Sequence, residues 1–137
     1  MNTTDDAAGF SSAASYQVLY IEDNPANLRL VSHILAKRKD VDLIAAHEPE
    51  LGLELANAHR PDLILLDINM PRLDGYQVLA LLRSNQQLQD TPVIAVSAAA
   101  MPRDIEKGKQ AGFSDYLTKP LNVVAFLATV DRFLVSC

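Results

Sequence analysis

Residues 62–75 have the sequence DLILLDINMPRLDG, and this stretch decides the fold. Its first part is a short apolar run that ends abruptly at Asp67, which predicts a strand over residues 62–66. A continuous apolar run of this length is typical of a strand buried on both faces, as in a parallel sheet. Apolar residues at helical spacing follow and predict a short helix over residues 75–83. A strand, a polar turn and a helix in this order make up the repeating unit of an α/β fold.

The same unit recurs on both sides of this stretch. Apolar runs predict four more strands, over residues 18–21, 41–45, 92–96 and 114–117. Periodic apolar residues predict four more helices, over residues 25–37, 49–58 and 102–111 and after a capping Asn122. Inward-facing side chains are expected at Leu51, Leu55 and Ala58 in the second helix and at Val123, Phe126, Leu127, Val130, Phe133 and Leu134 in the last. The helix ends carry their own signals, with Asn24 before Pro25 as an N-cap and Gly112 as a left-handed C-cap.

Five strands, each followed by a helix, predict an α/β fold with a parallel sheet covered on both faces. Right-handed crossovers then favour a flavodoxin-like, doubly wound sheet with strand order 2-1-3-4-5 and five helices. We expect one domain over residues 16–137, without an internal repeat. Residues 1–15 are rich in Ser, Thr, Ala and Asp, which predicts a flexible leader or linker remnant.

Composition limits the class of protein. The net charge of −5 disfavours direct nucleic-acid binding, because phosphate contacts need a basic surface. No apolar run approaches the ~20 residues of a membrane helix, and the N-terminus lacks a signal-peptide pattern. The single cysteine, Cys137, cannot form an intramolecular disulfide, which fits a reducing compartment. We therefore expect a cytoplasmic chain with no membrane segment.

Polar residues gather where the predicted strands end. Glu22 and Asp23, Asp67, Ser97 and Lys119 each follow an apolar run directly or within two residues. In open α/β sheets the carboxyl ends of the strands share one edge, and ligands bind there at the point where the winding reverses. Each residue alone would be read as a helix cap or a solvated loop residue. Together they predict one cleft.

The residue types in this cleft indicate its chemistry. Carboxylates brought close together repel, so a cation must join them or some must bind protons. Oxygen ligands suit Mg²⁺, whereas no cluster of histidine and cysteine offers a zinc site, and His33, His47 and His59 are scattered and expected at the surface. A carboxylate nucleophile beside a metal, a lysine and a hydroxyl predicts phosphoryl transfer by positioning and charge neutralisation.

The sequence resembles response-regulator receiver domains over about residues 17–135. The matching segments are VLYIEDN at 18–24, LLDINMP at 65–71 with Asp74-Gly75, VSA at 96–98 and YLTKP at 116–120. Further likeness, in residues 24–27, 97–101 and 117–121, is to receivers of hybrid histidine kinases. The family resemblance implies a two-component phosphorelay protein, with effector action left to a partner or to other parts of a longer chain.

The resemblance also implies roles for the acidic residues. Asp67 would accept a phosphoryl group from a phosphohistidine on a histidine kinase or histidine phosphotransfer protein. Asp23 and Asp67 would bind Mg²⁺ directly, with the backbone carbonyl of Asn69 as a further ligand. Glu22 would act mainly through a metal-bound water. Glu replaces the commoner Asp at this position, which lengthens the reach to the metal.

The remaining roles implied by the resemblance concern the switch. Lys119 would pair with the phosphoryl group, Ser97 would rotate to bond it, and Tyr116 would move inward. The bond before Pro120 would be cis, which only X-Pro bonds adopt cheaply. The surface formed by the predicted helix over residues 102–111, the strand over residues 114–117 and the helix after Asn122 would carry the signal to an unknown effector. Pro25, Ala26 and Leu28 on the first helix are candidates for docking the histidine-bearing partner, although Leu28 fits the core equally well.

Two other functions are compatible with part of this pattern. Hydrolases of the haloacid-dehalogenase type also use a strand-end Asp, but they carry a second Asp two residues later, where this chain has Asn69. A signalling domain is therefore expected rather than an enzyme. The alternative is a phosphorylation-independent interaction module, but such modules usually lose the acidic pair, the acceptor or the lysine, and this chain keeps all of them.

Overall fold

The computed structural model describes residues 16–135, so the expected leader over residues 1–15 and the terminal Cys137 lie outside the described residues. The strands are β2 Tyr16–Ile21, β3 Val41–Ala46, β4 Leu63–Asp67, β5 Val93–Ser97 and β6 Asp115–Thr118. The helices are α1 Pro25–Leu35, α2 Pro49–His59, α3 Gly75–Arg83, α4 Pro102–Ala111 and α5 Val123–Val135. All strand pairs are parallel, in the order β3-β2-β4-β5-β6. Numbered along the chain this is 2-1-3-4-5, so the predicted fold is confirmed.

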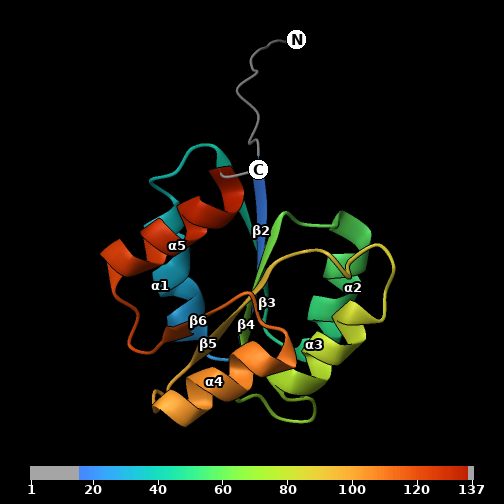
Figure 1. Ribbon diagram of the computed structural model, residues 1–137. Coiled ribbons are helices and arrows are strands. Elements are labelled where there is room, and N and C mark those ends of the chain that lie inside the picture. The colour runs from blue at the N-terminus through green and yellow to red at the C-terminus, as the bar shows by residue number, and fades with distance from the viewer. Residues whose placement is uncertain (1–15, 136–137) are drawn as a thin grey trace.

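Helices cover both faces of the sheet, with α1 and α5 on one side and α2, α3 and α4 on the other (Figure 1). The side chains of each strand alternate between the two layers. In β2, Val18 and Tyr20 face α1 and α5, whereas Leu19 and Ile21 face the other helices. The central strands β4 and β5 are buried at every residue. This double burial explains why the sequence shows them as unbroken apolar runs.

Two of the predicted inward residues are wrong. Ala58 of α2 is exposed, and the buried residues of this helix include Gly52 and Ala56 instead. A Cβ atom at Gly52 would lie 2.5 Å from Cδ1 of Ile21, so α2 turns its smallest residue toward the sheet. Val123 is 44% exposed, because it is the first residue of α5 and the buried stripe begins one turn later. The other expected inward residues of these two helices are buried or partly buried against the core.

The helix boundaries agree closely with the predicted ones. Helix α1 ends at Leu35 rather than at residue 37, and Asn24 caps its start by accepting a hydrogen bond from the backbone N–H of Ala26 at 2.8 Å. Gly112 ends α4 with a φ of 113° in the left-handed region. In residues 16–135, none of the helices is long and apolar enough to cross a bilayer.

Candidate functional site

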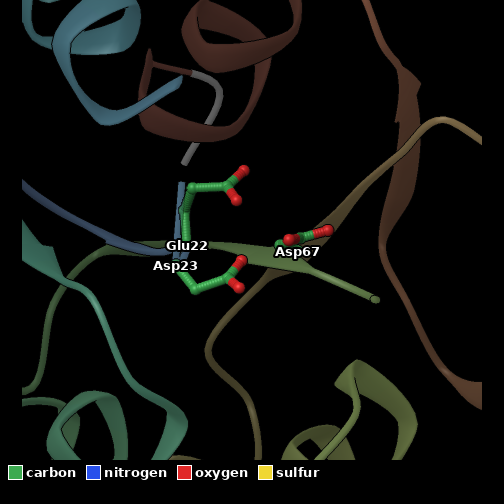
Figure 2. Close-up of side chains that lie close together, drawn as sticks. All are labelled: Glu22, Asp23 and Asp67. Atoms are coloured by element: carbon green, nitrogen blue, oxygen red, sulfur yellow. The ribbon is translucent and has the colours of Figure 1, made fainter. Parts of the chain in front are cut away.

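Three carboxylates meet at the carboxyl edge of the sheet. Glu22 and Asp23 follow β2, and Asp67 is the last residue of the neighbouring strand β4. Figure 2 shows the three side chains close together, and one carboxylate oxygen from each lies within 4.8 Å of the others. Glu22 and Asp67 are buried, whereas Asp23 is exposed. An all-oxygen cluster with one side open to water fits a hard cation such as Mg²⁺, which keeps several of its water ligands.

Glu22 is held by several hydrogen-bond donors. Its Oε1 accepts from the hydroxyl of Tyr20 at 2.8 Å and from Nδ2 of Asn27 at 3.3 Å, and lies 2.9 Å from Nζ of Lys119. Its Oε2 accepts from the backbone N–H of Asn24 at 3.2 Å. Burial by itself would raise the pKa of Glu22, but hydrogen bonds, led by the one from Lys119, outweigh burial and lower it. Glu22 therefore stays ionised although it is buried.

Asp67 has fewer donors. The backbone N–H of Asn69 donates to its Oδ1 at 3.2 Å, and Nζ of Lys119 lies 3.4 Å from the same oxygen. Burial, and then the proximity of Glu22, raise the pKa of Asp67 from 3.8 to about 7. The Asp67 carboxylate is thus incompletely compensated at neutral pH, and a cation would favour its ionised form.

Lys119 joins the two buried carboxylates. Burial alone would lower its pKa, but Glu22 and Asp67 raise it, so the ammonium remains charged. Its backbone N–H donates to the carbonyl of Ser97 at 2.9 Å, and the bond between Lys119 and Pro120 is cis. The lysine is therefore fixed to the end of β5 by its backbone, while its side chain reaches toward β2 and β4.

Ser97 and Tyr116 lie on the β5–β6 side of the acidic cluster. The Ser97 hydroxyl is buried, accepts from the backbone N–H of Ala99 at 3.1 Å and lies 3.5 Å from Nδ2 of Asn69. The hydroxyl of Tyr116 donates to the carbonyl of Ala99 at 2.8 Å. Tyr116 is 9% exposed, and its ring lies so close to Gly108 that a Cβ there would be 2.7 Å from Cδ2 of the ring. Both side chains thus converge on the backbone of Ala99.

The end of β4 is fixed by the start of α3. The backbone N–H of Gly75 donates to the carbonyl of Ile68 at 2.8 Å, and a Cβ at this glycine would lie 2.6 Å from Cα of Ile68. Asp74 caps the helix in a reciprocal pair with Gln77. Only a glycine permits this approach, which explains the need for the Asp74-Gly75 pair after the turn.

The structure brings together most of the predicted site residues and adds two. Glu22, Asp67 and Lys119 are in contact, and Asp23 completes the acidic cluster. Tyr20 and Asn27 also contact Glu22, and the sequence analysis missed both. In the sequence, Tyr20 appears only as part of the apolar run over residues 18–21. Strand periodicity could have indicated the contact between Tyr20 and Glu22, because residues two apart on a strand point to the same face.

Comparison with known proteins identifies the family. Residues 18–131 match the family described as the response regulator receiver domain. The chain is 37% identical over 117 residues to the polar-differentiation response regulator DivK of Brucella anthropi, covering 85% of this chain and 94% of that protein. The fold and acidic edge thus define a receiver of two-component signalling. The chain belongs to the response regulator receiver domain family, whose members are signalling domains rather than classical enzymes and interact with kinases, phosphotransfer proteins or effectors.

Solved structures agree with this assignment. The chemotaxis protein CheY4 of Vibrio cholerae superposes with a TM-score of 0.80 and 29% identity, covering 88% of this chain and 100% of that one. The receiver domain of a sensor histidine kinase from Pseudomonas aeruginosa PAO1 has a TM-score of 0.79 and 30% identity, covering 88% and 98%. That receiver was solved with a magnesium ion coordinated in its active-site cleft. The acidic cluster of the present chain, Glu22, Asp23 and Asp67, could also hold a metal.

Proposed function

We propose that Asp67 accepts a phosphoryl group from a phosphohistidine on a histidine kinase or a histidine phosphotransfer protein. A carboxylate oxygen of Asp67 forms the new bond to phosphorus, and the bond from phosphorus to the imidazole nitrogen breaks. The imidazole keeps that electron pair and later takes up a proton. The observation that carries the proposal is the environment of Asp67, a buried and under-compensated carboxylate beside two further acids and one lysine.

Mg²⁺ belongs to this proposal as the cofactor. Asp23, Asp67 and the backbone carbonyl of Asn69 would be its ligands, and Glu22 would act through a metal-bound water. The ion would neutralise the negative charge that accumulates between the phosphoryl oxygens and the carboxylates. Support comes from the oxygen-only donor set and from the spacing of the carboxylates, each with an oxygen within 4.8 Å of the others.

Lys119, Ser97 and Tyr116 would report the new charge. A phosphoryl group adds ~1.5–2 negative charges and three acceptor oxygens, which compete for the ammonium of Lys119 and the hydroxyl of Ser97. Because Ser97 and Tyr116 share Ala99 as a partner, a shift of one side chain alters the contacts of the other. The readout surface would be formed by α4, β6 and α5, where an effector binds. We assign this role to a receiver domain over residues 16–137, in the cytoplasm.

Phosphorylation by a small-molecule donor tests the proposal. Incubation with acetyl phosphate and Mg²⁺ should add one phosphoryl group, detected by intact mass, and peptide mapping should assign it to Asp67. Asp67→Asn should abolish the labelling. Asp74→Asn is the matched control, because Asp74 caps α3 outside the acidic cluster and Asn caps helices equally well. Equal labelling of Asp67→Asn would contradict the proposal, because another residue would then carry the phosphoryl group. No labelling of the unmodified chain would contradict it too and would favour the phosphorylation-independent module.

A further inference from the structure

We infer that Tyr20 is a positioning residue of the metal site, whose hydroxyl fixes the carboxylate of Glu22 in the orientation used for the cation. The inference rests on the proposed function and deepens it. Tyr20 is fully buried in β2 and belongs to the apolar layer under α1 and α5. Its hydroxyl nevertheless reaches Oε1 of Glu22 at 2.8 Å, from two residues earlier on the same face of the strand.

The hydroxyl of Tyr20 acts as a donor under all ordinary conditions. Burial, reinforced by the negative charge of Glu22, strongly raises the pKa of Tyr20, so the phenol keeps its proton. A donor on a rigid side chain that is packed in the core fixes the orientation of its acceptor more firmly than a donor on a flexible surface group does. Glu22 needs such an anchor, because a glutamate has one more rotatable bond than an aspartate and loses more conformational freedom when it is ordered.

The donors of Glu22 are divided unequally between its two oxygens. Oε1 has three partners, the Tyr20 hydroxyl, Lys119 and Asn27. Oε2 accepts from the backbone N–H of Asn24 at 3.2 Å. A carboxylate oxygen has two lone pairs, so Oε2 keeps an acceptor position for a water molecule on the cation. Tyr20 thereby determines which oxygen turns inward and which remains for the metal site.

Lys119 cannot provide this anchor by itself. Its Nζ lies 2.9 Å from Glu22 and 3.4 Å from Asp67, so it is already shared between two carboxylates. A phosphoryl group on Asp67 would draw the ammonium further toward the phosphoryl oxygens. Tyr20 stays bonded to Glu22 through this change, because Tyr20 is fixed in the core and Glu22 directly follows the end of the same strand. Glu22 therefore keeps its orientation when Lys119 is drawn away.

The test is the variant Tyr20→Phe, which keeps the ring and removes one oxygen atom. Calorimetric titration of the metal-free chain with MgCl₂ should show an affinity lower by about tenfold, the lower end of the effect of removing a hydrogen-bond partner behind a metal site. With acetyl phosphate as donor, the Mg²⁺ concentration for half-maximal labelling should rise by the same factor, while the rate at saturating Mg²⁺ changes less than about twofold. Tyr16→Phe, at the far end of the same strand, is the control and should behave as the unmodified chain.

A double-mutant cycle shows whether Tyr20 acts through Glu22. In a Glu22→Asp background, where the carboxylate is drawn back by one methylene, Tyr20→Phe should change the Mg²⁺ affinity less than about twofold. A purely structural effect of the hydroxyl would be equally large in both backgrounds, and that result would overturn the inference. Unchanged Mg²⁺ affinity in Tyr20→Phe, with labelling of Asp67 intact, would overturn it too but leave the proposed function standing. Weaker Mg²⁺ binding in Tyr20→Phe, together with no labelling of Asp67 in the unmodified chain, would refute the proposed function but not the role of Tyr20 in the metal site.

Discussion

The buried carboxylates at the ends of two neighbouring strands differ in how many hydrogen-bond donors surround them. At the end of β2, Glu22 is surrounded by donors from side chains and backbone, and its pKa is lowered. At the end of β4, Asp67 is also buried, but it accepts from one backbone N–H and lies 3.4 Å from Nζ of Lys119, compared with 2.9 Å for Glu22. Its pKa is raised to about 7. Of two buried carboxylates at the same edge of the sheet, one thus has its hydrogen-bond acceptors well supplied with donors and the other does not.

This contrast separates a supporting acid from a reacting one. A carboxylate that several donors hold in one orientation is suited to keep a metal-bound water in place through its remaining acceptor position. A carboxylate that lacks donors is stabilised by any cation or covalent neutralisation at its oxygens. The difference in donors therefore supports Asp67 as the acceptor and Glu22 as its support.

The largest effect is expected from removing the group that the two strand ends share. Lys119→Met leaves Glu22 and Asp67 as adjacent buried acids without their common cation. We expect the free energy of unfolding to fall by about 2–4 kcal/mol at pH 8 in EDTA, measured by urea denaturation. The loss should be smaller at pH 5, where Asp67 carries a proton.

Lys109→Met provides the control for this prediction, because Lys109 is an exposed lysine of α4. Its removal should change stability by less than about 0.5 kcal/mol. Equal effects of the two lysine variants would mean that the buried carboxylates do not depend on Lys119, and the contrast between the strand ends would lose its basis.

The next effect concerns Asp67 itself and depends on pH. Because its pKa is about 7 in the folded chain and 3.8 ordinarily, the fold favours the protonated form. This contribution to stability is fully present below about pH 4 and is lost as the pH rises through about 7. Asp67→Asn removes the charge, so in EDTA it should stabilise the chain by about 1–2 kcal/mol at pH 8 and by much less at pH 5.

Thermal unfolding across pH 5–8 measures this difference. Mg²⁺ should narrow the gap at pH 8, because the ion stabilises the unmodified chain and binds the variant more weakly. A constant difference between the two chains over the whole pH range would show that Asp67 does not titrate near neutrality. The acceptor would then be as well compensated as Glu22.

The sequence predicted the fold well because burial on both faces leaves a plain signal. β4 and β5 are buried at every residue, and their apolar runs ended within one residue of the observed strands. The acidic cluster was also predictable, because parallel strands bring their carboxyl ends to one edge. That rule alone predicts that Glu22, Asp23 and Asp67 lie close together, as they do in the structure.

What the sequence missed depends on how elements rotate and how side chains turn. Ala58 faces solvent because the close approach of Gly52 to Ile21 sets the rotation of α2, and helical spacing does not reveal that contact. The bond from Tyr20 to Glu22 was missed for a related reason. A tyrosine in an apolar run satisfies the burial pattern completely, and the destination of its hydroxyl depends on the strand twist and the glutamate rotamer.

The smallest effect should come from removing one of the several donors of Glu22. Asn27 donates to Oε1 at 3.3 Å, the longest of the hydrogen bonds that Glu22 accepts. In Asn27→Ala the remaining donors still satisfy the carboxylate, and alanine improves the helix propensity of α1. We expect the free energy of unfolding in urea to change by less than about 0.5 kcal/mol at pH 8. A loss above about 1.5 kcal/mol would mean that Glu22 is as short of donors as Asp67, because a well-supplied carboxylate tolerates the loss of its weakest partner.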